Sequence, residues 1–287
     1  MQKIGFIGVG IMGKSMVRNL MKAGFELHIF ARTKAKVEDV ISEGAIYHPS
    51  IAECVKGCEA VITIVGFPTD VEEVYFKAGN ILDSAEKGAY LIDMTTSSPA
   101  LAERIAKEGT KRGFKVLDAP VTGGDIGAKN GTLSILVGGA KEDYEACHKL
   151  FEGMGTNINY QGSYGAGQHA KLANQIVIAG TLSGVCEALA YAKAKGLDLG
   201  VWLNSVATGA AGSAQMNSFG PKILEGNFQP GFFLKHFIKD MRLAKEEALV
   251  SGLELEILEQ VLANYEGLAA QGLDNLGTQA LIKHYEK

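Results

Sequence analysis

The stretch KIGFIGVGIMGKSMVRNLMKAGFELHIFART, residues 3 to 33, decides the fold of the N-terminal half. An apolar run, a glycine-rich turn, a helix-sized segment and a second apolar run follow one another, which is typical of a β-α-β unit. Its glycines, Gly8, Gly10 and Gly13, have the spacing G-x-G-x-x-G. The first permits a tight turn, the second lets backbone approach a pyrophosphate, and the third lets the helix pack closely on the strand. We therefore expect these glycines to bind a dinucleotide, together with Ile11 and Met12 at the start of the helix.

The segment after the second apolar run indicates which dinucleotide binds. Folds of this kind that bind NAD usually carry an acidic residue here, which binds the ribose 2′-hydroxyl. This chain has Arg32, Thr33 and Lys36 instead. A guanidinium and a hydroxyl suit a 2′-phosphate, so we expect NADP(H) in preference to NAD(H). Alternatively, Arg32 and Lys36 are charges of a solvated loop.

Short apolar runs alternate with helix-sized segments up to about residue 162. The runs expected to form strands are 3–8, 27–30, 60–65, 89–94, 115–121 and 133–139. Such alternation predicts an α/β fold with a parallel sheet covered on both faces. Strand patterns stop after residue 165, where the first of several helices is expected over 167–195. We therefore predict a Rossmann-type doubly wound parallel sheet over residues 1–163, followed by an all-helical domain over residues 164–287 that begins with a long interdomain helix.

Composition narrows the class of ligand. The chain has 287 residues, 47% of them hydrophobic, and a formal net charge of −4. This balance argues against nucleic acid or an anionic membrane surface as a partner and favours a small molecule. The longest apolar stretch contains polar residues and falls short of the ~20 apolar residues of a membrane span, so we expect a core helix.

Cysteine and histidine spacing predicts no metal site. The four cysteines include no C-x-x-C pair, and His169 and His236 lack the spacing of metal ligands. We expect the cysteines to be reduced thiols. No secretory signal is recognisable before the first strand, so we expect a cytoplasmic protein.

Lys171 lies at the start of the longest apolar stretch of the chain, in GAGQHAKLANQ (165–175). On a helix that begins near residue 167, Asn174 and Gln175 lie on the same face as Lys171. A lysine in an apolar neighbourhood has its pKa lowered by desolvation, which makes it a usable proton donor and acceptor. The alternative is a lysine of the first helical turn that extends to solvent. Periodicity does not decide between them.

Ligands of open α/β sheets bind beyond the carboxyl ends of the strands. Thr95 follows the fourth expected strand, and we expect it to contact the cofactor. The fifth is followed by Thr122, Gly123 and Gly124, whose hydroxyl and exposed N–H groups suit a substrate carboxylate. The alternative is an ordinary turn.

Four ordered segments resemble the β-hydroxyacid dehydrogenase family. They are IGFIGVGIMGKSMVRNLMKAG, DAPVTGG, GAGQHAKLANQ and FFLKHFIKDMRLA. The resemblance implies that Lys171 is the catalytic lysine, that DAPVTGG is the substrate loop and that Asn174 orients the substrate. It also implies that Lys239, with Asp240, closes the site from the helical domain, and that Lys239 contacts both substrate and cofactor. Periodicity alone places Lys239 on a solvated helix face, opposite an apolar stripe.

The chain departs from the family pattern at three places. Thr122 stands where many relatives have serine, which keeps the hydroxyl. Gln175 stands where the family motif often has asparagine, and Asn174 comes one residue earlier, so either amide can be the one that contacts substrate. Where this chain has GFP at 66–68, many relatives have a proline-containing loop of different composition.

The resulting hypothesis is an oxidoreductase that transfers hydride between NADP(H) and a short β-hydroxyacid or semialdehyde acid. The substrate types implied are 3-hydroxyisobutyrate, tartronate semialdehyde, glyoxylate and succinic semialdehyde. The alternatives are an imine reductase of similar architecture, disfavoured by Lys171, a phosphogluconate dehydrogenase, disfavoured by the short helical region, and a non-catalytic NADP-binding scaffold. The long apolar helix and the resemblance favour a homo-oligomer, either dimer or tetramer.

Overall fold

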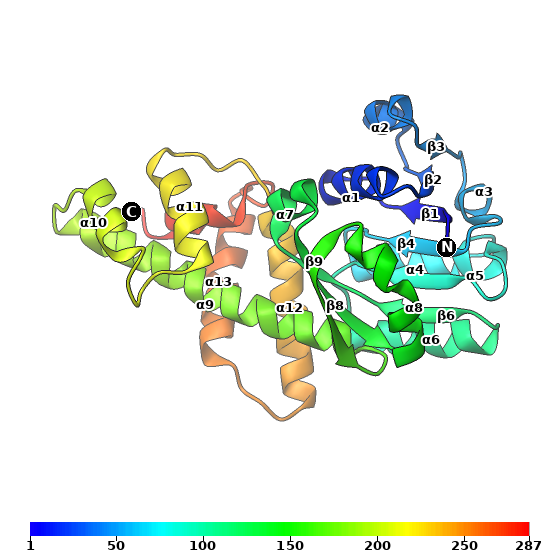
Figure 1. Cartoon of the computed structure of the whole chain (residues 1–287). Helices are drawn as coiled ribbons and strands as arrows, with labels where there is room; N and C mark the ends of the chain where they lie inside the picture. Colours follow the sequence, from blue (N-terminus) through cyan, green and yellow to red (C-terminus); the bar gives the residue numbers. More distant parts are fainter. Residues whose placement is uncertain (287) are drawn as a thin grey trace. The chain divides into compact units, whose positions relative to one another are not determined.

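The computed structural model describes residues 1–286. Two compact units divide the chain, Met1–Lys171 and Leu172 onward. The division falls inside one continuous helix, α9 (Ala166–Ala194), so no loop separates the units in sequence. Unit 1 holds every strand, and unit 2 is made of helices (Figure 1).

Unit 1 is built on one mixed sheet. Its strand order is β3-β2-β1-β4-β5-β6-β8-β7, with β9 paired to β8. The strands are β1 (Lys3–Ile7), β2 (Glu26–Phe30), β3 (Ile46–Tyr47), β4 (Ala60–Thr63), β5 (Tyr90–Asp93), β6 (Lys115–Asp118), β7 (Val121–Thr122), β8 (Leu133–Gly139) and β9 (Gly155–Gly162). The first six pair in parallel in the order 3-2-1-4-5-6, which is the Rossmann order.

The predicted parallel sheet is confirmed for its main part and wrong at one edge. Five of the six expected strands form as single strands, whereas the run 115–121 forms two, β6 and β7. β8 runs antiparallel to both of these. The sequence pattern gives no direction for a strand, because an apolar run buried on both faces looks the same either way. β3 and β9 were not expected. β3 has two residues, and β9 is a largely exposed, polar edge strand without an apolar alternation.

Helices between the strands pack on both faces of the sheet. They are α1 (Ile11–Lys22), the 3₁₀ turn η1 (Lys34–Val37), α2 (Glu38–Ser42), α3 (Ile51–Val55), α4 (Pro68–Phe76), α5 (Ile81–Ser84), α6 (Pro99–Lys111), α7 (Gly124–Asn130) and α8 (Lys141–Glu152). Two separate apolar clusters form the core, as a sheet covered twice requires. One contains Phe6 and Ile29, and the other contains Ile7 and Val61.

Unit 2 is all-helical, as predicted. After α9 come α10 (Leu199–Val206), α11 (Ala214–Leu224), α12 (Leu234–Val250), α13 (Glu256–Ala270) and the 3₁₀ turn η2 (Thr278–His284). α12 packs against α13 (Figure 1). Phe237 of α12 meets Tyr265 of α13 edge to face. The apolar stripe of α12 is therefore the one that its sequence predicted.

The helix α9 has the length and the apolar composition of a membrane span. The expectation that this stretch is too short was wrong, because its polar residues do not interrupt the helix. Of its most apolar 18-residue window, 44% is buried inside the structure, and buried residues such as Leu182 belong to the core of unit 2. Core helices of soluble proteins can have the same length and composition, so these two properties alone do not identify a membrane span.

All four cysteines are free and buried, which confirms the expected thiols. Burial raises the pKa of Cys58 to about 11 and the pKa of Cys54, Cys147 and Cys186 to about 12. At neutral pH these groups are therefore thiols rather than thiolates, and thiols are poor nucleophiles.

Candidate active site

The glycine-rich turn has the geometry that its spacing predicts. Gly8 has φ of +101°, and a Cβ there would lie 2.0 Å from the carbonyl oxygen of Ile64. A Cβ on Gly13 would lie 2.1 Å from the carbonyl oxygen of Gly8, so only glycine lets α1 pack this closely on β1. A Cβ on Gly10 would meet no atom within 4 Å. The backbone before α1 is thus open to a ligand, and the helix N-terminus offers N–H groups to a pyrophosphate.

The residues expected to favour NADP(H) over NAD(H) lie on the loop after β2. Arg32, Thr33 and Lys36 are exposed, and 84% of the Arg32 side chain is accessible. The guanidinium of Arg32 lies 3.5 Å from the carboxylate of Asp70, which accepts a hydrogen bond from the Phe67 backbone at the start of α4. Exposure alone fits both a phosphate-binding loop and a solvated loop.

Buried polar side chains connect the ends of β4 and β5. Asp93 accepts hydrogen bonds from the Thr63 hydroxyl at 2.8 Å and from the Thr95 backbone at 3.1 Å. The Thr95 hydroxyl accepts a hydrogen bond from the backbone of Val65 at 3.0 Å. These hydrogen bonds hold Thr95, which we predict to contact the cofactor, in one orientation near the end of β4. β4 is the neighbour of β1, which leads into the glycine-rich turn.

Lys171 lies in the second turn of α9, and only 7% of it is exposed. The alternative of a lysine that extends to solvent is therefore wrong. Two buried side chains attach the first turn of α9 to the sheet: Asp118, at the end of β6, and Gln168. Neither was predicted as a site residue. The carboxylate of Asp118 accepts hydrogen bonds from the backbone of Gly165 at 2.8 Å and of Gln168 at 2.9 Å.

Burial raises the pKa of Asp118 from its ordinary value of 3.8 to about 6, partly offset by its backbone hydrogen bonds. A raised pKa in the folded state means that the folded protein binds this proton more tightly than the unfolded chain. The proton on Asp118 therefore stabilises the folded state. This stabilisation is complete below pH 3.8, the ordinary pKa of the group, and is lost as the pH rises through about 6.

We expect this loss to vanish in Asp118→Asn. From pH 5 to pH 8 the free energy of unfolding of the wild type should fall, relative to the variant, by about 1 kcal/mol. Urea unfolding at both pH values measures this difference. The exposed carboxylate Glu86, replaced by Gln, is the control and should show no such trend. A pH-independent difference between wild type and Asp118→Asn would contradict the assignment.

The predicted substrate loop is more than a turn. Thr122 ends the short strand β7, where it pairs with Ser134 of β8. Gly123 and Gly124 follow with φ of +126° and +65°, and both are exposed. This left-handed backbone suits glycine and leaves the N–H groups at the start of α7 accessible.

In unit 2 the predicted residues belong to a buried polar network. Asp240 is fully buried, and its carboxylate lies 2.8 Å from the ammonium of Lys239, whose side chain is 12% exposed. The Gln175 amide donates a hydrogen bond to Asp240 at 2.5 Å and accepts one from Asn174 at 2.9 Å. The interpretation of Lys239 as part of a solvated face is therefore wrong. Both ends of the Gln175 side chain are used inside the protein, whereas Asn174 is half-buried.

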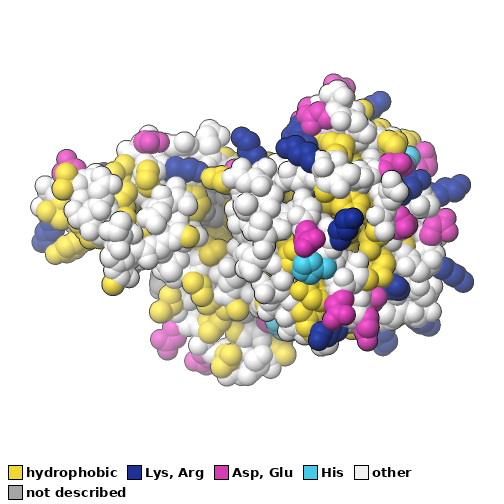
Figure 2. All heavy atoms as spheres, in the orientation of Figure 1, with side chains coloured by type: hydrophobic (Ala, Val, Ile, Leu, Met, Phe, Trp, Pro, Cys, Tyr) yellow, Lys and Arg dark blue, Asp and Glu magenta, His cyan; other side chains and the backbone are white. Residues whose placement is uncertain are grey.

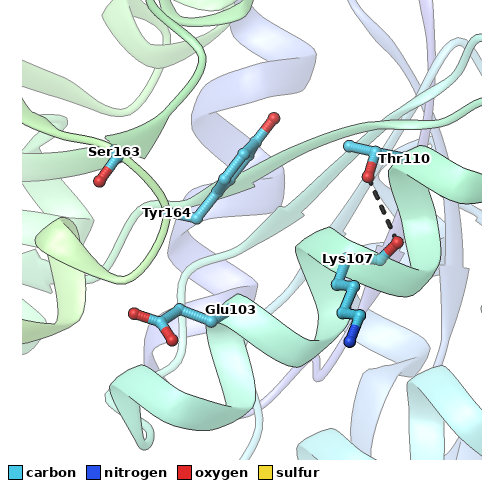
Figure 3. A pocket seen from close by; sticks show the side chains of 5 residues that line it. All are labelled: Glu103, Lys107, Thr110, Ser163 and Tyr164. Carbon is cyan, nitrogen blue, oxygen red and sulfur yellow. Dashed lines mark hydrogen bonds between the residues drawn. The ribbon is translucent and has the colours of Figure 1, made fainter.

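Other surface features lie apart from these residues. A shallow cavity of about 290 Å³ is lined by Glu103, Lys107, Thr110, Ser163 and Tyr164, none of them a predicted site residue. Figure 3 shows Tyr164 extending beside the three residues of α6. Charges of both signs are interspersed over the visible face of unit 1 (Figure 2). Within residues 1–286 no three side chains of the metal-binding types come together.

Family models cover nearly the whole chain. Residues 3–162 match the NAD-binding domain of 6-phosphogluconate dehydrogenase, and residues 165–285 match the NAD-binding domain of NADP-dependent 3-hydroxyisobutyrate dehydrogenase.

Individual relatives agree with these models. A probable 3-hydroxyisobutyrate dehydrogenase-like protein of Arabidopsis thaliana is 44% identical, over 99% of this chain and 85% of its own length. The 2-hydroxy-3-oxopropionate reductase of Escherichia coli is 34% identical over 99% and 97%. The solved structure of Mycobacterium tuberculosis 3-hydroxyisobutyrate dehydrogenase with L-serine superposes with a TM-score of 0.89, at 27% identity over the full length of both chains.

The chain combines a Rossmann-like unit with a helical unit, and both match NAD(P)-binding domains of dehydrogenases. It is therefore an oxidoreductase. The chain belongs to the β-hydroxyacid dehydrogenase family.

Proposed function

We propose that the protein interconverts a short 3-hydroxy carboxylate and its 3-oxo counterpart, with NADP(H) as the preferred cofactor. The observation that carries this proposal is the buried amine of Lys171, one helical turn before Asn174 on α9. A buried amine beside an amide suits proton exchange with a substrate oxygen.

The names of the relatives support the substrate class. They refer to 3-hydroxyisobutyrate, 2-hydroxy-3-oxopropionate and, in the solved structure, bound L-serine. These molecules share a carboxylate and an oxygen on the third carbon, and they differ in the group on the second carbon. We infer that this chain recognises the shared part.

Each residue has a defined task in this proposal. Gly8, Gly10 and Gly13 with the start of α1 would hold the pyrophosphate, and a bound nicotinamide would supply or accept a hydride at the third carbon. Lys171 gives a proton to the carbonyl oxygen in reduction and takes the hydroxyl proton in oxidation. The hydroxyl of Thr122 and the N–H groups of Gly123 and Gly124 bind the carboxylate, and Asn174 orients the substrate.

A panel of substrates tests the proposal. Purified protein is assayed for NADPH and NADH oxidation with tartronate semialdehyde, glyoxylate and succinic semialdehyde, and for reduction of both nucleotides with 3-hydroxyisobutyrate and L-serine. We expect turnover of at least one compound with a carboxylate and an oxygen on the third carbon. Turnover of glyoxylate or succinic semialdehyde alone, or of no compound, with nucleotide binding intact, would contradict the proposal.

The cofactor preference depends on Arg32. A charge-assisted hydrogen bond to a 2′-phosphate contributes about 1.5 to 3 kcal/mol, so Arg32→Ser should raise the KM for NADPH about tenfold to a hundredfold. The KM for NADH and both kcat values should change little. The control is Arg104→Ser, another exposed arginine of unit 1, paired with Glu72. An equal loss with both nucleotides would exclude a role in phosphate recognition.

A further inference from the structure

The first turn of α9 lacks a capping side chain of its own. Gly165 precedes the helix with φ of +85°, and glycine has no oxygen to accept the hydrogen bond of the third helical N–H. Asp118, 50 residues before Gln168, supplies that oxygen: its carboxylate accepts from Gln168 and from Gly165 itself. A buried carboxylate on strand β6 thus caps the helix that carries Lys171.

Gln168 makes a second attachment, to the segment after β5. Its side chain is fully buried, and both ends are used. The amide oxygen accepts a hydrogen bond from the Ser97 backbone at 2.8 Å, and the amide nitrogen donates one to the carbonyl of Thr95 at 2.7 Å. Two strand ends therefore fix one turn of helix.

The packing around this attachment is too close for larger residues. A Cβ on Gly167 would lie 2.5 Å from the carbonyl oxygens of Asp118 and Leu136. A Cβ on Gly138 would lie 2.6 Å from the Asp118 carboxylate. Two glycines thus let helix, strand and carboxylate meet, and the turn has little freedom to shift.

We propose that Asp118 and Gln168 are positioning residues, which orient the amine of Lys171 by fixing the first turn of α9. Lys171 follows Gln168 by three residues, so the direction of its side chain depends on the rotation of that turn. A displacement of about 1 Å at a reacting group can reduce turnover about a hundredfold. This inference rests on the proposed role of Lys171.

A double-mutant cycle between Gln168→Met and Lys171→Ala separates positioning from general support. Methionine fills the space but makes neither hydrogen bond of Gln168. In the wild-type background we expect Gln168→Met to reduce kcat tenfold to a hundredfold, with the KM for NADPH changed less than twofold. In the Lys171→Ala background it should reduce the residual kcat less than twofold, because no amine is left to orient.

The assay uses NADPH and whichever panel compound the wild type turns over fastest. Added ethylamine, a free amine that needs no helix, should restore Lys171→Ala and the double variant to the same extent. The exposed Gln161 of β9, replaced by Met, is the matched control and should retain wild-type kcat. If Gln168→Met does not fold, Asp118→Asn takes its place in the cycle, because it keeps one acceptor oxygen and loses the other of the two that bind the backbone of Gly165 and Gln168.

The outcomes distinguish the two proposals. Equal losses from Gln168→Met in both backgrounds would overturn the positioning role and leave Lys171 as the proton donor. A Lys171→Ala variant with normal turnover would overturn the proposed function instead. If the wild type turns over no panel compound, hydrogen exchange decides whether the attachment exists. Gln168→Met should then accelerate exchange of the amides of residues 165–171 at least tenfold, and unchanged exchange would overturn the inference.

Discussion

Lys171→Met should lower kcat by about three orders of magnitude while the affinity for NADPH stays within twofold of wild type. Proton transfer by a placed side chain contributes about 10² to 10⁴ in rate, and methionine keeps the apolar volume without the proton. Lys171 is only 7% exposed, so no water is expected to replace its amine freely. Stopped-flow turnover and NADPH fluorescence titration measure the two quantities.

Lys193→Met is the matched control for this change. Lys193 lies on the same helix α9, near its other end, and is exposed. It should retain wild-type kcat and affinity. A Lys171→Met variant with near-normal turnover would show that another group exchanges the proton.

Lys239→Met should lower the free energy of unfolding by about 3 to 5 kcal/mol, because it leaves the fully buried Asp240 without its cation at 2.8 Å. Adding Asp240→Asn should recover most of this loss, since the uncompensated charge is removed while the size of the side chain is kept. Equilibrium urea unfolding of the single and double variants measures both effects. Activity should not return in the double variant if Lys239 contacts the ligands, as the family resemblance implies.

The control for Lys239→Met is an exposed ion pair that joins the same helix, α12, to its neighbour α13. Lys245 of α12 lies 3.3 Å from Glu259 of α13, and both are more than a third exposed. Lys245→Met should cost less than about 1 kcal/mol, because water screens such pairs. Similar losses from Lys239→Met and Lys245→Met would show that burial of Asp240 is not the cause.

Local patterns in the sequence predicted most of the fold. The β-α-β unit at the N-terminus, most of the expected strands and the long helix α9, which was expected over 167–195, follow from periodicity and from turn residues. The polar edge strand β9 and the antiparallel direction of β8 do not, because neither depends on a local apolar pattern. They follow from pairing with distant segments.

The site residues were harder to derive. Periodicity did not decide whether Lys171 extends to solvent, and it placed Lys239 on a solvated face. The resemblance to the family singled out both lysines. Their burial depends on packing that no local pattern records. Asp118 belongs to DAPVTGG and Gln168 to GAGQHAKLANQ, but no pattern in these segments indicates what the two side chains bind. One signal was present: Gly165 precedes a long helix without a capping side chain, so its cap had to come from elsewhere.

The four buried thiols have a practical consequence for experiments on this protein. Since all four are buried and have pKa values of about 11 to 12, they should react slowly with maleimides in the folded state. A cysteine introduced at an exposed position would then be the preferred target for a fluorophore or spin label. Distance measurements between such labels, with and without nucleotide, would need no prior removal of the native sulfhydryls.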